Sequence, residues 1–136
     1  MPFWRMHCHL IWSTKDREPA IDATGEAEIR TSIIAVAHKF GGYVHAVGVV
    51  ENHVHVAVSI PPSRRVSDVV REMKGRSAYH VNLKRGEDQP RFIWQTEYGA
   101  LSFGDSAMEG IVKYVLNQKE HHRNGTTHRR FEIDSE

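Results

Sequence analysis

The chain has 136 residues, 40% hydrophobic and 26% charged, so we expect one globular domain over residues 1–136 and exclude a disordered or fibrous chain. Cys8 is the single cysteine, which excludes an internal disulfide, and without a signal-peptide pattern or a stretch of roughly 20 apolar residues we expect a cytoplasmic protein. The net charge of +1 neither requires nor excludes a polyanionic partner, but basic residues gather in two segments, at Arg64, Arg65, Arg71, Lys74, Arg76, Lys84 and Arg85, and at Arg123, Arg129 and Arg130.

Hydrophobic periodicity predicts seven elements along the chain. Strands are indicated where apolar residues alternate, and helices where they recur at intervals of three and four residues. In chain order we expect a strand over residues 4–13, a helix over about 26–40, strands over 43–51 and 52–60, a helix from about 66, a strand over 92–104, and a last helix ending near 123.

Turn and capping residues predict where these elements meet. Glycine is expected after a helix end, and serine or aspartate at a helix start. We therefore expect the first helix to end at Gly41-Gly42, a tight hairpin at Glu51-Asn52, a cap on the second helix from Ser63 or Ser67, and a cap on the third from Asp105 or Ser106.

The order of elements, β-α-β-β-α-β followed by one more helix, indicates the fold class. Two split βαβ halves form the ferredoxin-like arrangement, an antiparallel sheet with two helices on one face. We therefore predict an α+β protein of this type with an additional C-terminal helix.

The predicted third strand carries two histidines on one face. Strand alternation directs Val54, Val56, Val58 and Ile60 to the helices and His53, His55, Ala57 and Ser59 to the opposite face. The Cβ atoms of His53 and His55 are expected about 6.5 to 7 Å apart, so both rings can reach one metal ion. Such a pair by itself is more often an ordinary polar face, and a third ligand is needed to favour a metal site.

The last predicted helix offers that third ligand. Tyr114 and Gln118 stand four residues apart and share one helix face, while apolar residues on the remaining sides can anchor the helix, at Met108, Val112, Val115 and Leu116. The alternative interpretation makes Tyr114 a buried packing residue and Gln118 a surface amide. Tyr98 is a competing tyrosine, but it has no glutamine partner at this spacing.

Together these motifs resemble a known family. The stretch ENHVHVAVSIPP, a basic helix, WQTEYGALSF and then KYVLNQKEHH look like the HUH single-tyrosine transposases, which include the IS200-like and REP-associated tyrosine transposases of bacteria. The resemblance implies a homodimeric DNA transposase that cuts and rejoins single-stranded DNA beside hairpins. It also implies a nucleoid-associated protein in a bacterial cytoplasm. By the same resemblance Tyr114 is the nucleophile, acting in its own chain or in its partner's, and His53, His55 and Gln118 are the metal ligands.

The chemistry of these residues suits that role. A phenol with a pKa near 10 is a poor nucleophile at neutral pH, and a phosphodiester repels anions, so attack requires a nearby cation. Two imidazoles and one amide are neutral ligands that leave a divalent ion its full charge. We expect Mg²⁺ or Mn²⁺ as cofactor, with better activity in Mn²⁺ because imidazole suits it better. The expected intermediate is a 5′-phosphotyrosine.

Candidate DNA contacts lie on basic surfaces: Lys15 and Arg17 in the first loop, and Arg71, Lys74 and Arg76 on the second helix. Ordinary surface charge is an equally good interpretation of each. His121 could contact phosphate or metal, and His9 could orient a ligand histidine through its second nitrogen. Packing of His7, His9 and His45 against the last helix is a simpler interpretation.

Two other functions fit parts of the pattern. A domesticated, non-cleaving module could bind single-stranded nucleic acid on an open ferredoxin-like sheet, but the central strands lack the alternating aromatics that stack on bases. A small metal-dependent hydrolase or oxygenase could use His53 and His55, yet no carboxylate follows on the same strand face. No segment predicts a membrane partner.

Overall fold

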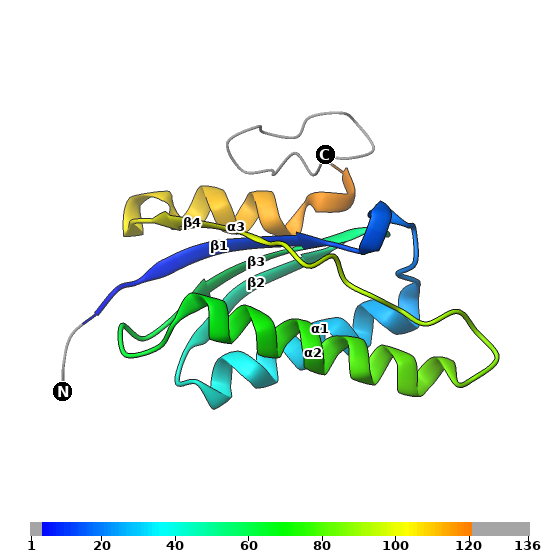
Figure 1. Cartoon of the computed structure of the whole chain (residues 1–136). Coiled ribbons are helices and arrows are strands. Elements are labelled where there is room, and N and C mark those ends of the chain that lie inside the picture. The colour runs from blue at the N-terminus through cyan, green and yellow to red at the C-terminus, as the bar shows by residue number, and fades with distance from the viewer. Residues whose placement is uncertain (1–3, 121–136) are drawn as a thin grey trace.

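The computed structural model describes residues 4–120, and it places one helix on one face of an antiparallel sheet and two helices on the other (Figure 1). In the sheet the strand order is β2-β3-β1-β4, so the predicted ferredoxin-like arrangement is confirmed. The elements are β1 (His7–Ser13), α1 (Ala23–Lys39), β2 (Tyr43–Val49), β3 (His53–Ser59), α2 (Val66–Arg85), β4 (Gly99–Phe103) and α3 (Met108–Leu116), with 3-10 turns at Lys15–Arg17 and Asp105–Ala107.

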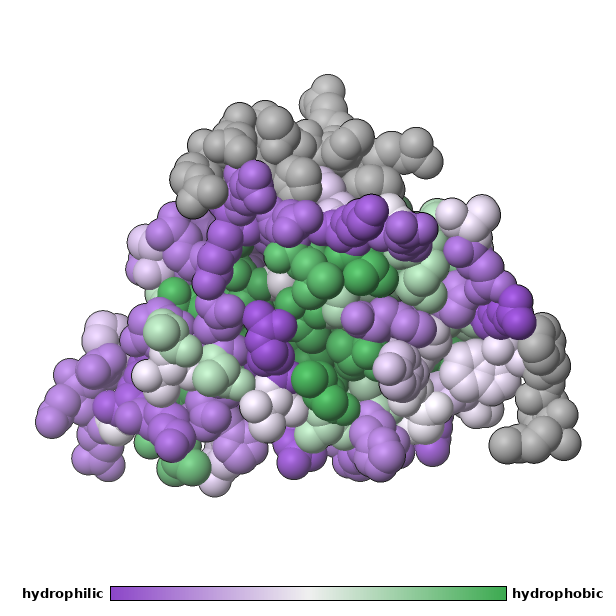
Figure 2. Space-filling model, turned by 180° about the vertical axis from the view of Figure 1, so that it is seen from behind, coloured by the Kyte–Doolittle hydropathy of each residue, from purple (hydrophilic) through white to green (hydrophobic). Residues whose placement is uncertain are grey.

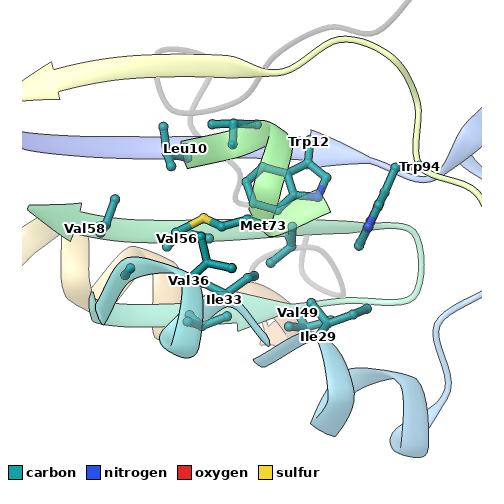
Figure 3. Close-up of a cluster of buried hydrophobic side chains, with 14 of the residues drawn as sticks. Leu10, Trp12, Ile29, Ile33, Val36, Val49, Val56, Val58, Met73 and Trp94 are labelled. Carbon is teal, nitrogen blue, oxygen red and sulfur yellow. The ribbon is translucent and has the colours of Figure 1, made fainter. Parts of the chain in front are cut away.

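The main core lies between the sheet and the pair α1 and α2 (Figure 3). The inward face predicted for β3 is confirmed, because Val54, Val56, Val58 and Ile60 lie in this core and are at most 4% exposed. Leu10 and Trp12 of β1 join them there. Helical spacing predicts inward stripes on both helices, and the structure confirms them at Ile29, Ile33, Val36, Ala37, Val69, Val70, Met73 and Val81. Two residues of these predicted stripes, Phe40 and Val66, are only partly buried. Burial of this apolar surface holds β3 in one register, because a slip of one residue would reverse its faces.

Several predicted element ends are wrong. α1 begins at Ala23, three residues earlier than expected, because the Asp22 carboxylate accepts a hydrogen bond from the Gly25 amide at 2.8 Å. α2 has Arg65 at its N-cap with no side-chain bond, so neither Ser63 nor Ser67 caps it. The hairpin between β2 and β3 has a three-residue connection, residues 50–52.

The fourth strand is shorter than predicted. Only Gly99–Phe103 pairs with β1, while residues 92–98 run irregularly with a single bridge from Trp94 to Thr14. Here α2 competes for the backbone: the Phe92 amide donates to Asn82 Oδ1 at 2.7 Å, and Asn82 Nδ2 donates to the Phe92 carbonyl at 3.0 Å. The Trp94 indole donates to Ser77 Oγ at 2.9 Å, so the segment is attached to α2 by side chains.

α3 covers the second face of the sheet (Figure 1) through a small apolar cluster, Ala46, Ala57, Ile111 and Val115. The predicted anchor Leu116 is wrong, because it is 58% exposed, and Ile111 provides the contact instead. Neither Asp105 nor Ser106 caps α3, since Ala107 precedes it and Asp105 binds other side chains. α3 ends at Leu116 with a turn at Asn117, and residues 118–120 are helical again. The predicted helix end near residue 123 lies outside the described residues.

No helix within residues 4–120 combines the length and the apolar character that crossing a bilayer requires.

Candidate active site

His53 and His55 lie on β3, on the sheet face that α3 covers. They are 2% and 0% exposed, and their ring centroids are 5.0 Å apart. Side chains alternate between the two faces of β3, so both imidazoles point away from the main core, as predicted. They are covered by α3 and are not exposed to solvent.

Each of these histidines uses its Nδ1 atom in a hydrogen bond with a neighbouring side chain. His53 Nδ1 lies 2.8 Å from the side-chain oxygen of Asn52, and His55 Nδ1 lies 2.8 Å from Nε2 of His9. Because an amide oxygen only accepts, His53 donates its Nδ1 proton to Asn52, which makes Nε2 its lone-pair atom. The sequence suggested an orienting role for His9, and its contact with His55 agrees with that suggestion.

Tyr114 is on the buried side of α3, directly against the histidines. Its ring centroid is 5.8 Å from that of His55 and 6.4 Å from that of His9, and the residue is 5% exposed. The competing tyrosine, Tyr98, is 39% exposed and precedes β4, beside Glu97 and Gly99. The structure therefore brings Tyr114, and not Tyr98, to the histidine pair.

Gln118 follows the end of α3 and is 1% exposed. Its Nε2 donates to the Tyr114 carbonyl at 2.7 Å, so the amide is tied to the helix that carries the tyrosine. A Cβ added at Gly48 would lie 3.0 Å from Gln118 Cγ, and Gly48 is the β2 partner of His55. The four predicted residues thus lie in one cluster within a single chain.

Gly48 is the residue that lets α3 approach this closely, and sequence reasoning missed it. A Cβ at this position would lie 1.9 Å from the Val115 carbonyl oxygen. A glycine inside a strand is a known signal of close backbone approach, so its place in the strand pattern could have revealed it. Gly110 on α3, by contrast, has no such neighbour within 4 Å.

An ion-pair cluster holds the segment after α3 against α1. Lys119 Nζ lies 2.7 Å from Glu26 Oε1, and Arg30 pairs with the other oxygen of Glu26 at 3.1 Å. Burial alone would raise the pKa of Glu26, but the hydrogen bonds from Lys119 and Arg30 outweigh it and lower that pKa. Arg30 also donates to the Val47 carbonyl at 2.7 Å, so the cluster lies next to Gly48.

A second polar network lies at the start of α3. His7 bonds to Asp105 Oδ1 at 2.6 Å and to Ser59 Oγ at 2.7 Å, while His45 lies 2.6 Å from the same hydroxyl. Hydrogen bonds from His7 and Arg5 lower the pKa of Asp105, and burial lowers the pKa of His45, with a smaller contribution from the charge of His7. His7 and His45 therefore have structural partners on β3 and, for His7, in the 3-10 turn before α3.

The donor set suits a divalent cation. His53 and His55 supply two neighbouring imidazoles, and within residues 4–120 no three His, Cys, Asp or Glu side chains are placed to hold a metal ion. The Gln118 amide is buried at the same place, and because its nitrogen donates to Tyr114, its oxygen is the atom suited to a cation. These residues fit the group that the resemblance implied.

The predicted DNA contacts divide into two groups. Lys15 and Arg17 are exposed on the 3-10 turn and line a groove with residues 93–96, and Arg76 is exposed on α2. Arg71 pairs with Asp68 at 2.9 Å but stays 81% exposed. Lys74 is half-buried, and its ammonium donates to the carbonyls of Gln95 and Glu97, so it is occupied in the fold. His121 lies outside the described residues.

Comparison with known proteins identifies the family. Residues 2–118 match the family described as Transposase IS200 like. The chain belongs to this family. The HUH single-tyrosine transposase resemblance read from the sequence is therefore confirmed, and the chain is a transposase by family.

The relatives of this transposase share its fold at low sequence identity. The ISDra2 transposase TnpA of Deinococcus radiodurans is 23% identical over 121 residues, which cover 86% of each chain. A crystal structure of a proposed transposase from D. radiodurans R1 is 22% identical, with a TM-score of 0.67, and the match covers 86% of this chain and 93% of the other. A REP-associated tyrosine transposase bound to a REP hairpin is 16% identical, with a TM-score of 0.66 and coverage of 93% and 76%.

Proposed function

We propose that this transposase cuts and rejoins single-stranded DNA beside hairpins through a covalent 5′-phosphotyrosine intermediate on Tyr114. One observation supports this above the others. Tyr114 lies against His55, and Gln118 is bonded to the helix that carries Tyr114, in a cluster that is at most 5% exposed.

In the proposed reaction the Tyr114 oxygen attacks the phosphorus of a phosphodiester. The new bond joins phosphorus to Tyr114, the bond from phosphorus to the 3′ oxygen breaks, and the leaving 3′ oxygen takes a proton while the phenol loses one. The phosphoester bond is conserved, so the 3′-hydroxyl of another strand can later displace Tyr114 and join the DNA without ATP. Strand transfer is the same exchange in reverse.

A divalent cation held by His53, His55 and Gln118 would stabilise charge on the phosphate, and we propose Mg²⁺ or Mn²⁺ for this role. The protein positions the reacting groups and keeps water away from them. α3 excludes water from the histidines, so an electrostatic interaction there is stronger than it would be in solvent.

For the partners we propose hairpin DNA and a second copy of the chain. The exposed basic residues Lys15, Arg17 and Arg76 provide phosphate contacts near the sheet edge and on α2. Hydrophobic side chains gather in the middle of one face (Figure 2). Such a surface suits a partner subunit, which supports the proposed homodimer. We propose that this transposase acts in the bacterial cytoplasm.

The alternative, a non-cleaving module that binds nucleic acid on its open sheet, finds little support. α3 covers the face that such a module would use, and His9, His53 and His55 are at most 2% exposed on it. Nucleic-acid bases could not stack there unless α3 moved away.

Incubation of the protein with end-labelled hairpin DNA and Mn²⁺ tests the proposed function. The parent and a Tyr98→Phe control should form a protein–DNA adduct that survives denaturation, and Tyr114→Phe should form none. Tyr98→Phe is a matched control because it removes the same hydroxyl from the other tyrosine considered. An adduct in Tyr114→Phe, or its absence in the parent, would overturn the proposal.

A further inference from the structure

Two tautomers are available to the histidine pair at the centre of the cluster. His55 Nδ1 lies 2.8 Å from His9 Nε2, and both residues are at most 1% exposed. A neutral imidazole has one donor nitrogen and one acceptor nitrogen, so the proton between these atoms belongs to only one of the rings. The ring that owns it determines which nitrogen of His55 has a lone pair.

His53 has no such choice. Its Nδ1 faces the oxygen of Asn52, an atom that only accepts, so the Nδ1–H tautomer of His53 is determined by its neighbour. His9, by contrast, can either accept from His55 or donate to it. If His9 donates, His55 has its proton on Nε2 and has no lone pair there for a cation.

We propose that His9 is a positioning residue that accepts the Nδ1 proton of His55 and so holds His55 as an Nε2 ligand. This inference rests on the proposed function, in which His55 binds a divalent cation. His9 touches neither DNA nor cation in this proposal and acts through His55 alone. Outer-shell partners of ligating histidines fix the ring and its tautomer in the same way.

The packing around His9 keeps its ring in place. His9 pairs with Ala57 across the β1–β3 ladder, and Ala57 follows His55 on the same face of β3. The small side chain of Ala57 leaves room for the His9 ring to reach diagonally to His55, with the ring centroids 5.0 Å apart. The Tyr114 ring lies 6.4 Å away on the α3 side, edge to face. A substitution at His9 therefore acts directly on His55, the predicted ligand that its ring contacts.

Two substitutions separate this role from simple packing. His9→Gln keeps an acceptor oxygen near the position of Nε2, whereas His9→Leu fills similar space without any acceptor. The first readout is the nitrogen NMR spectrum of histidine-labelled, metal-free protein, which reports the tautomer of His55. The second is the affinity for Mn²⁺, measured from the free-ion EPR signal without DNA.

We expect the Nδ1–H tautomer at His55 in the parent and in His9→Gln, and a loss of that preference in His9→Leu. We expect Mn²⁺ affinity to fall about 10- to 100-fold in His9→Leu and to be largely retained in His9→Gln. An Nε2–H tautomer at His55 in the parent would overturn the proposal even if His9→Leu did not fold. Parent-like tautomer and affinity in His9→Leu would also overturn it while leaving the proposed function intact. A parent that binds no Mn²⁺ but shows the expected tautomers would refute the metal-dependent function, and with it the positioning role, while the hydrogen bond from His55 to His9 would remain correctly assigned.

Discussion

Substitution of Gly48 by alanine tests whether α3 must lie directly on β2. The added Cβ would stand 1.9 Å from the Val115 carbonyl oxygen, about 1.5 Å inside ordinary van der Waals contact. That oxygen is backbone and has no rotamer to change, so the helix itself must move. Because Tyr114 and Gln118 flank Val115, both would move away from the histidines.

We estimate the effect from two sources. Overpacking of a well-fitted contact costs about 1 to 3 kcal/mol of unfolding free energy. A displacement of about 1 Å at reacting groups can lower a rate about 100-fold, so adduct formation should fall by at least that order. Urea denaturation measures the first quantity, and the rate of adduct formation with hairpin DNA measures the second. Hydrogen exchange of α3 amides reports the displacement itself, because a helix lifted from its contact opens more often.

Gly110→Ala is the matched control for this experiment. Gly110 lies on the exposed side of the same helix, and a Cβ there would meet no such neighbour within 4 Å. Helix propensity predicts a gain of up to about 1 kcal/mol at that position. The reasoning is refuted if Gly48→Ala keeps parent-like α3 exchange and adduct rate, or if Gly110→Ala loses both.

Three further predictions concern charged residues. Hydrogen bonds from His7 and Arg5 lower the pKa of Asp105, so its carboxylate stabilises the fold at pH values above the ordinary aspartate range, and this contribution is lost as pH falls below about 4. The difference in unfolding free energy between the parent and Asp105→Asn should therefore shrink on acidification. A difference that stays constant with pH would contradict this prediction. Exposed Arg76 and half-buried Lys74 should differ in the property that their loss changes. Arg76→Ala should reduce the slope of log affinity for single-stranded DNA against log salt by about 0.7, with little change in the unfolding free energy. Lys74→Ala should lower the unfolding free energy, measured by urea denaturation, because it removes the hydrogen bonds to the carbonyls of Gln95 and Glu97. The loss should be only about 1 kcal/mol, since these bonds are partly exposed to solvent. Equal salt slopes for the parent and Arg76→Ala would remove Arg76 from the DNA surface.

The regular elements and their buried faces could be predicted from the sequence. Alternation along β3 is a property of neighbouring residues, so it assigns His53 and His55 to one face and the valines to the other without any knowledge of the fold. The spacing of Tyr114 and Gln118 is local in the same sense. Motif order along the chain was enough to indicate the family.

What only the tertiary structure decided are the contacts between residues distant in sequence. The length of β4 depends on whether α2 or β1 binds the backbone near Phe92, a competition that no local pattern records. Asp105 resembles a helix cap in sequence, but His7 and Arg5, about 100 residues earlier, bind its carboxylate. The approach of α3 to Gly48, the contact of His9 with His55, and the burial of the whole cluster have the same origin, because each requires two elements to pack before its partners meet.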